Sequence, residues 1–318
     1  MNRRELLMAG GCCALAGLAP LRAAFAGPFD YALRPMTVAP DTHVLLGTTE
    51  YFSRDNGGNI VNTGFIVTGD GVVVIDTGPS LRYGQQMRAA IAAATDKPVA
   101  KVLNTHLHPD HFLGNGAFED RPITAGQVTR DLIRRDGDAL AENLYRLVGD
   151  WMRGTRAVEP TQVLSALVED IGGHRLRYLL LNGHTDSDLA VLDESTGVLF
   201  ASDLVFHDRM PTTPHADLKA WMASLDVLAG LSFAVLVPGH GAVARDRAPI
   251  VQTRAYLSWL DATFDEAARA GLSMTEVMRL PLPPEFAGMA LAREEFERSA
   301  VHLYPARVKA ALPVTAAK

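Results

Sequence analysis

The segment His106-Leu-His108-Pro-Asp110-His111 constrains this chain more than any other part of it, because it places four possible metal ligands within six residues. The segment follows an apolar, strand-like run at residues 99–105, so we expect it at the carboxyl end of a strand. Open α/β sheets bind their ligands at that edge. The sequence therefore predicts a metal site at the end of a sheet.

Three later segments carry further ligand types, and each of them also follows an apolar run: residues 183–189, 201–204 and 238–241. The same strand-end argument then brings seven side chains to one edge: His106, His108, Asp110, His111, His184, Asp203 and His240. The remaining histidines, taken singly, are expected to be ordinary hydrogen-bonded residues: His43, His174, His207, His215 and His302.

In this order, the four segments resemble the metallo-β-lactamase superfamily, and the likeness runs from about Thr42 to Gly241. The resemblance implies an α/β fold, the αββα four-layer sandwich, and a site for two metals. His106, His108 and His184 would hold the first metal, Asp110, His111 and His240 the second, and Asp203 would bridge them. Imidazole and carboxylate ligands suit divalent metals such as zinc.

Two cations that share a water stabilise its hydroxide at neutral pH, so the resemblance implies a metal-bound hydroxide as the nucleophile. Asp110 is the candidate for catalytic proton transfer to the leaving group, and simple metal ligation is the alternative. Asp76 ends the apolar run 71–76 and is expected to support the metal ligands from behind.

The bridging residue departs from many zinc β-lactamases, which carry Cys or Ser where this chain has Asp203. Aspartate is used at this position by the glyoxalase II, lactonase and phosphodiesterase branches, so antibiotic hydrolysis is not expected to be the main activity. An oxygen bridge is also less selective for zinc than a thiolate is. We therefore expect two divalent metal ions, zinc first, with iron and manganese left open.

A closer resemblance comes from residues 52–67, 74–80 and 104–115, together with residues 286–293 and 301–305. These segments are similar to the SoxH-like group called quinoprotein relay system zinc metallohydrolases. The group name refers to pyrroloquinoline-quinone dehydrogenase systems, so the resemblance implies a functional link to a quinoprotein dehydrogenase. It does not name a substrate.

The first 26 residues have the pattern of a signal peptide. The pair Arg3-Arg4 precedes an apolar stretch at residues 8–21, and a small-residue cleavage site ends at Ala26. We expect twin-arginine export and a periplasmic location, with an ordinary secretory signal as the alternative. A lipoprotein attachment at Cys12 is disfavoured, because no large aliphatic residue occupies the three positions before it.

Both cysteines, Cys12 and Cys13, lie in this signal, so the mature chain would contain neither a disulfide nor a thiolate ligand. Removing the signal changes the formal charge from −6 to about −8. Nucleic-acid binding normally requires a basic surface, so an acidic chain argues against it. We expect a small-molecule substrate, no nucleic-acid partner and no membrane insertion of the mature chain.

Alternating strand and helix patterns predict two packed sheets with outer helices over residues 27–246. Strands are expected at 42–51, 60–68, 72–76, 99–105, near 123, 175–181, 189–193, 198–202 and 234–237, and helices at 80–95, 127–152 and 217–229. Residues 247–318 have helical spacing and are expected to form a C-terminal helical extension. Its final helix would end at Pro305, and the extension would pack on the domain, on a partner subunit or beside the substrate pocket.

Substrate choice is expected to come from loops around the metals. Residues 53–59 resemble the mobile flap of β-lactamase relatives, and Arg54 within them is a candidate for binding a substrate carboxylate. A solvent-facing arginine is the alternative. His215, at the end of segment 207–215, is a second candidate for substrate contact.

Three functions fit the sequence. The favoured one is a periplasmic dinuclear zinc hydrolase of a small ester, thioester, lactone or lactam, in the SoxH-like setting or as a β-lactamase-like or glyoxalase II-like enzyme. The second is an iron-dependent sulfur oxidoreductase with one iron, which His111 and His240 argue against because they complete a second site. The third is a non-catalytic accessory that handles metal or cofactor for a quinoprotein.

Overall fold

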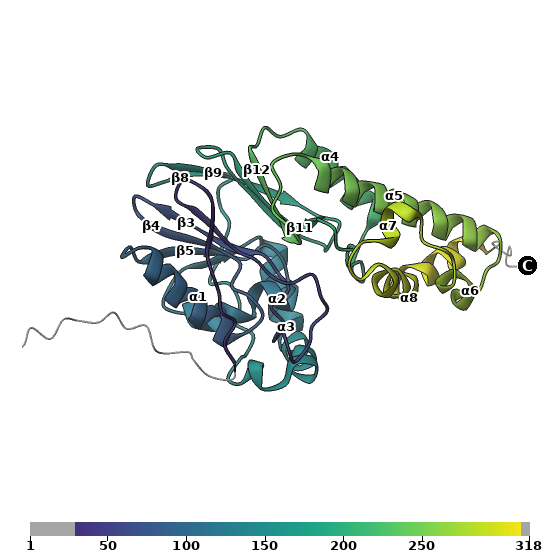
Figure 1. The fold of residues 1–318 in the computed structure, drawn as a ribbon, viewed down its shortest axis with the longest axis horizontal. Helices are drawn as coiled ribbons and strands as arrows, with labels where there is room; N and C mark the ends of the chain where they lie inside the picture. The colour runs from purple at the N-terminus through teal and green to yellow at the C-terminus, as the bar shows by residue number, and fades with distance from the viewer. Residues whose placement is uncertain (1–28, 313–318) are drawn as a thin grey trace, which may run out of the picture. The chain divides into compact units, whose positions relative to one another are not determined.

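The computed structural model describes residues 29–312, so the predicted signal peptide lies outside the described residues. From Tyr31 onward the chain forms one compact unit. Within this unit two β-sheets pack face to face and helices cover both outer sides (Figure 1). The expected αββα sandwich is therefore confirmed.

The first sheet contains seven strands in chain order: β1 (Met36–Ala39), β2 (Thr42–Leu45), β3 (Thr63–Thr68), β4 (Gly71–Ile75), β5 (Val99–Leu103), β6 (Ile123–Ala125) and β7 (Gln162–Val163). Strands β1 to β4 are antiparallel, and β4 to β7 run parallel to one another. The carboxyl ends of β4 and β5 therefore meet at one edge, where Asp76 and the histidine segment follow them.

The second sheet has the order β12-β11-β10-β9-β8. Its strands are β8 (Val168–Ile171), β9 (His174–Leu181), β10 (Asp188–Asp193), β11 (Val198–Phe206) and β12 (Val235–His240). The pair β11 and β12 is parallel, and the other neighbours are antiparallel. All residues of β10, β11 and β12 are buried, because helices cover the face that does not meet the first sheet.

The helices fall into two groups. On the side of the first sheet lie α1 (Leu81–Ala94), α2 (Pro109–Phe112), α3 (Gln127–Val148) and two short 3₁₀ helices (Leu113–Phe118 and Gly149–Met152). On the side of the second sheet lie α4 (Leu218–Ala229), α5 (Ala248–Arg269), α6 (Met274–Met278), α7 (Pro284–Ala287) and α8 (Ala292–Ala311). Ser80 caps α1 by accepting a hydrogen bond from the Tyr83 amide, as its sequence predicts.

Two hydrophobic cores hold these layers together. Between the sheets, Ile66 and Val73 of the first sheet pack in one cluster with Val191 and Phe200 of the second. Gly64 permits this close approach, because a Cβ there would lie 2.5 Å from the Phe200 ring. The larger core joins the second sheet to α4, α5 and α8, so the C-terminal helices complete the outer layer of the sandwich.

Several predicted strand limits were wrong. The strand expected at 42–51 ends at Leu45, and the one expected from residue 60 begins at Thr63. The strand expected to end at Ser202 continues to Phe206, so Asp203 lies inside β11 and not after it. Ser202 has φ +49°, and the pairing of β11 with β12 shifts at this residue. The irregularity directs the Asp203 side chain inward without ending β11.

The predicted end of the last helix at Pro305 was also wrong, because α8 runs from Ala292 to Ala311. A proline within a helix removes one amide donor, here the one that would bond the carbonyl of Val301. Val301 is 46 % exposed, so water can satisfy that carbonyl. Tyr304 is 1 % exposed and anchors the helix through burial, which compensates for the lost hydrogen bond.

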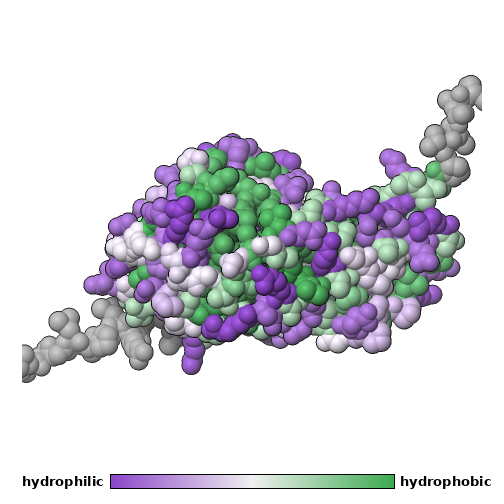
Figure 2. Space-filling view, turned by 90° about the horizontal axis from the view of Figure 1, so that it is seen from above, coloured by the Kyte–Doolittle hydropathy of each residue, from purple (hydrophilic) through white to green (hydrophobic). Residues whose placement is uncertain are grey.

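The outer surface is mixed in polarity. Hydrophobic residues reach the middle of the face seen in Figure 2, between hydrophilic margins. A shallow groove on the surface includes Leu167 and Leu180, which are 59 % and 45 % exposed. Among residues 29–312, no helix has both the length and the apolar character needed to cross a membrane.

Asn62 connects the two sheets at the edge that carries the predicted ligands. Its side-chain amide donates to the carbonyls of Pro238 (2.9 Å) and Gly241 (2.8 Å), and its side-chain oxygen accepts from the Gly47 amide (3.1 Å). We predict that Asn62→Ala lowers the free energy of unfolding by about 2–4 kcal/mol, because two buried carbonyls and one partly buried amide lose their partners. Denaturant unfolding measures the change.

The exposed Asn182 provides the control, because Asn182→Ala removes a side chain of the same type at the surface. This variant should stay within about 0.5 kcal/mol of the parent. Equal stability of the two variants would contradict the role assigned to Asn62.

Candidate metal centre

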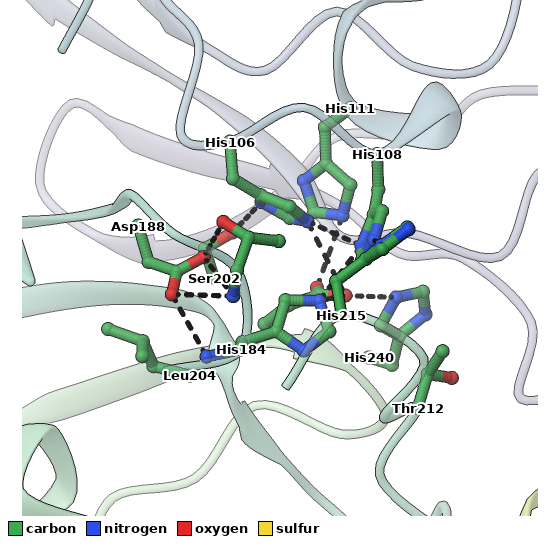
Figure 3. A network of polar contacts seen from close by, with 12 residues as sticks. His106, His108, His111, His184, Asp188, Ser202, Leu204, Thr212, His215 and His240 are labelled. Carbon is green, nitrogen blue, oxygen red and sulfur yellow. Dashed lines mark hydrogen bonds and ion pairs between the residues drawn. The ribbon is translucent and has the colours of Figure 1, made fainter. Parts of the chain in front are cut away.

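Five parts of the chain position the seven predicted ligands. His106 and His108 lie in the loop after β5, and the following helix α2 carries Asp110 and His111. His184 follows β9, Asp203 lies within β11 and His240 is the last residue of β12. Pro109 opens α2, where its missing amide costs no helical hydrogen bond and its fixed φ favours the first turn. All seven side chains are buried and form two neighbouring groups. Figure 3 shows the five histidines of this set turned toward one another.

The first group contains His106, His108, His184 and Asp203. Nδ1 of His108 lies 3.0 Å from Nε2 of His106 and 2.9 Å from Nε2 of His184. Asp203 Oδ2 lies 3.3 Å from Nε2 of His184 and 3.8 Å from Nε2 of His106. Three imidazole nitrogens and one carboxylate oxygen thus face a common centre.

The second group contains Asp110, His111 and His240. Asp110 Oδ2 lies 3.8 Å from Nε2 of His111 and 3.5 Å from Nε2 of His240. Asp203 reaches this group as well, because its Oδ1 lies 3.1 Å from His111 Nε2 and its Oδ2 lies 3.2 Å from His240 Nε2. Asp203 therefore occupies the position between the two groups that the sequence predicted for a bridge.

The donor atoms fit two divalent cations. Nε2 of His111 and Oδ1 of Asp203 are buried without a hydrogen-bond partner among the described residues, although they lie 3.1 Å apart. A buried polar atom without a partner is costly, and a cation bound between these atoms would remove that cost. Nitrogen and oxygen donors in these numbers match the preferences of zinc and of other borderline divalent metals.

The protonation tendencies differ between the two groups. Burial, followed by neighbouring imidazoles, holds the pKa of His106 and of His108 well below the usual value. Burial also opposes charge on His111, but the carboxylates of Asp203, Asp76 and Asp110 raise its pKa well above normal. Neutral imidazole is the form that binds metal, so His106 and His108 are ready ligands near neutral pH.

A set of hydrogen bonds at the carboxyl ends of β4 and β5 orients two of the ligand histidines. Asp76 accepts from Nδ1 of His111 (2.8 Å) and from the amide and hydroxyl of Thr105 (both 2.8 Å). The Thr105 hydroxyl lies 3.0 Å from Nδ1 of His106 and 2.8 Å from the Ser202 hydroxyl. The structure thus places Asp76 behind the ligands, where such contacts fix the ring orientation and tautomer.

Sequence reasoning missed Thr105 and Ser202 as supporting residues. Both flank predicted ligands directly, Thr105 before His106 and Ser202 before Asp203, and this adjacency was the available signal. Asp76 and Ser202 adopt positive φ values of 57° and 49°, which non-glycine residues seldom do. Two strained positions in contact with Thr105 indicate that the surrounding structure determines this geometry strongly.

Asp188 was also missed. Its carboxylate accepts from the amide of His184 (3.0 Å) and from the amide and hydroxyl of Thr185, which fixes the turn that carries His184. Burial raises the pKa of Asp188 to about 6. The pattern His184-Thr-Asp-Ser-Asp188 offered a signal, since a carboxylate that follows closely in a turn commonly accepts backbone amides.

A cavity of about 330 Å³ opens above the two groups. Asp110, Asp203, His108 and His240 lie at its ligand end, and its walls include residues of the loop after β2, of α3 and of α8. His215 lines the cavity, with its Nδ1 2.9 Å from Nε2 of His108. Arg54 is exposed and is not among the described lining residues, so contact with a substrate remains only a prediction for it.

This fold and site define an αββα protein with converging ligands for two cations. A sequence model of the metallo-beta-lactamase superfamily matches residues 56–240. The chain belongs to this superfamily. The matched segment holds all seven ligands, whereas α5 to α8 lie beyond it.

Three relatives illustrate the range of similar proteins. The linear primary-alkylsulfatase of Pseudomonas sp. is 22% identical over 275 residues, covering 73% of this chain and 52% of the sulfatase. The lactamase-like protein nscB of Neosartorya fischeri is 28% identical over 211 residues, covering 65% and 57%. The atrochrysone carboxyl ACP thioesterase of Aspergillus fumigatus is 26% identical over 198 residues, covering 60% and 54%. The chain spans a little over half the length of these relatives.

Solved structures support the fold. A metallo-beta-lactamase from Pontibacter korlensis aligns with a TM-score of 0.59 at 22% identity, covering 71% of this chain and 99% of that protein. A metallo-beta-lactamase from Hirschia baltica aligns with a TM-score of 0.55 at 20% identity, covering 71% and 97%. At these identities the likeness concerns the fold alone.

Gly239 gives a direct test of the centre. A Cβ at this position would lie 1.9 Å from Oδ1 of Asp203 and 2.7 Å from its amide, so any side chain must displace the bridging carboxylate. We predict that Gly239→Ala lowers the bound metal from about two to less than one per chain, because the bridge serves both groups. Elemental analysis after zinc loading measures the content, and circular dichroism checks the fold.

Gly288→Ala is the matched control, because nothing lies within 4 Å of a Cβ at that glycine. It should bind metal as the parent does. Full metal content in Gly239→Ala would show that Asp203 does not act as the bridge.

Proposed function

We propose that this protein is an exported, dinuclear zinc-dependent hydrolase that cleaves an ester or thioester bond of a small molecule. One observation carries the proposal: seven buried ligands form two groups around the shared carboxylate of Asp203, at the end of a cavity. Such a constellation is costly to maintain without cations, and it is open to a ligand on one side.

Bound at these groups, two cations would supply a Lewis acid and an activated water. The chain supplies the remaining parts of the reaction. Asp110 belongs to the second ligand group and also lines the cavity, 3.5 Å from His240. A carboxylate in this position can hold a water by a hydrogen bond and pass a proton to the leaving group. His215 lines the same space and can donate to a substrate oxygen.

The choice of an acyl bond rests on two arguments. The bridging position holds Asp203, and the glyoxalase II, lactonase and phosphodiesterase branches also use aspartate there, two of which cleave acyl bonds. Several relatives are named as thioesterases, among them the atrochrysone carboxyl ACP thioesterase and thioesterase pkgB of Emericella nidulans. The alkylsulfatase relative makes a sulfate ester the second candidate, because its match extends over the longest part of this chain among those described here.

Export and a link to a quinoprotein dehydrogenase are part of the proposal. The twin-arginine pattern at Arg3-Arg4 supports export in the folded state, in which metals can be bound before transport. The SoxH-like segments support the quinoprotein link. Zinc is the proposed metal because the donors are mainly imidazole nitrogens.

The defining experiment measures hydrolysis by the zinc-loaded protein across a panel of bond types. The panel contains an acyl thioester, an aryl ester, a lactone, a cephalosporin, a phosphodiester and an alkyl sulfate. Faster turnover of the acyl thioester or the aryl ester than of the other compounds would support the proposal. Turnover of the alkyl sulfate alone would replace the acyl bond with a sulfate ester. No turnover with two zinc ions bound would refute the hydrolase function, and an accessory role would then be favoured.

The iron alternative needs a separate measurement. Two measurements on protein purified from its native host decide between iron and zinc. The first is the metal content, and the second is the oxygen consumed when a persulfide is added. One iron per chain together with oxygen consumption would favour the sulfur oxidoreductase. Two zinc ions without oxygen consumption would exclude it.

Asp110→Asn tests the proton-transfer role. The amide keeps the shape and can still ligate through oxygen, but it cannot accept the proton, so we predict that kcat falls by about 10²- to 10⁴-fold. Steady-state kinetics at fixed, measured metal content give the result. Asp96→Asn, at an exposed and distant carboxylate, is the control and should keep full activity. A variant with two metals and unchanged kcat would leave Asp110 as a ligand only.

A further inference from the structure

One wall of the cavity above the metal centre carries cationic side chains. Part of this wall comes from residues outside the segment that the family model matches. Arg209 and Thr212 come from the segment after β11, and Arg298 comes from α8. All three line the cavity. Arg298 lies beyond residues 56–240, so the C-terminal helices contribute directly to the space where a substrate would bind.

Arg209 is buried and paired with groups of its own surroundings. It is 1 % exposed, and its guanidinium lies 3.3 Å from the Met210 carbonyl, 3.2 Å from the Thr212 hydroxyl and 3.4 Å from Oε1 of Glu295. Glu295, on α8, is 0 % exposed and also accepts from Thr212 at 2.7 Å. A buried arginine requires such a carboxylate, so Glu295 is committed to Arg209.

Arg298 has to share that same carboxylate. Its Nη1 lies 3.7 Å from Oε1 of Glu295, which is beyond hydrogen-bonding distance. Glu295 is therefore shared between two guanidinium groups, and its longer contact is the one to Arg298. The side chain of Arg298 is 39 % exposed, so its guanidinium is open to a ligand in the cavity. The carboxylates of Asp110 and Asp203 line the cavity too, but they face the histidines.

The rest of the cavity wall is largely apolar. Phe52 and Ile60 come from the loop after β2, and Leu140 and Leu147 come from α3. A cavity of this composition favours a ligand with a hydrocarbon part and one anionic group. The hydrocarbon part of the ligand would bury apolar surface against the wall, and its anionic group would pair with Arg298. A neutral or cationic ligand would not form an ion pair with the Arg298 guanidinium.

We propose that Arg298, held beside the Arg209–Glu295 pair, forms a subsite for an anionic oxygen group of an amphiphilic substrate, remote from the bond that is cleaved. The substrate class is an ester or thioester whose hydrocarbon portion carries a terminal carboxylate or sulfonate. This inference rests on the proposed function for the identity of the cleaved bond, but the subsite itself can be tested without turnover.

The kinetic test compares aryl esters of one acyl chain length that end in a carboxylate, a sulfonate, a neutral carboxamide or an ammonium group. The zinc-loaded parent should prefer the anionic esters to the carboxamide by about tenfold or more in kcat/KM, as expected for a charge-assisted hydrogen bond. Arg298→Gln should remove most of that preference. Arg298→Glu should reverse it in favour of the ammonium ester. The carboxylate and sulfonate arms identify which anion is preferred.

Arg279→Gln is the control, because Arg279 is exposed directly after α6 and is absent from the described cavity wall. It should keep the parent's preference. Equal use of anionic and neutral esters by the parent, or an unchanged preference in Arg298→Glu, would overturn the subsite.

A binding measurement separates this inference from the proposed function. Octanoate is titrated into the zinc-loaded parent and into Arg298→Gln, with octanamide as the neutral reference. The subsite predicts that octanoate binds Arg298→Gln about tenfold more weakly, while octanamide binds both proteins alike. If no ester is hydrolysed but this difference is found, the hydrolase function fails and the subsite stands. If octanoate binds both proteins equally, the subsite fails whatever the turnover.

Discussion

The carboxylate of Asp203 is the group on which the rest of the site depends. It lies within about 3.3 Å of His111, His184 and His240, which come from different parts of the chain. Burial alone would raise its pKa, but the charges of His240 and His111 lower it well below normal. A charge of this kind is stable in the interior only with several partners. The left-handed Ser202 and the absence of a side chain at Gly239 serve the same requirement, because they direct and admit this carboxylate.

Much of the fold and the ligand set could be predicted from the sequence, since both depend on local patterns. His106 to His111 follow a short apolar strand, and α2 begins at the proline within them. The layers follow from alternating strands and helices, and Ser80 marks a helix start by its own hydrogen bond. These features require only neighbouring residues, so a linear pattern contains them.

The parts that could not be predicted depend on contacts between distant residues. Strand β11 continues through Asp203 because β12 pairs with it on both sides of the irregularity at Ser202. Helix α8 continues through Pro305 because Tyr304 is buried, which the proline itself does not reveal. The position of Arg298 beside a cavity built mainly by the family domain likewise has no local signal. Tertiary packing decides each of these cases.

The two sheets contribute ligands unequally to each metal position, and this has a consequence for the whole molecule. His106 and His108 follow the first sheet, whereas His184 and Asp203 belong to the second, so a cation in the first group joins both halves of the sandwich. The second group joins them again through His111 and His240. Metal binding and cohesion of the halves are then thermodynamically linked, since separating the sheets would release the ions. Bound metals would add to the hydrophobic core in keeping water out of the interior between the sheets.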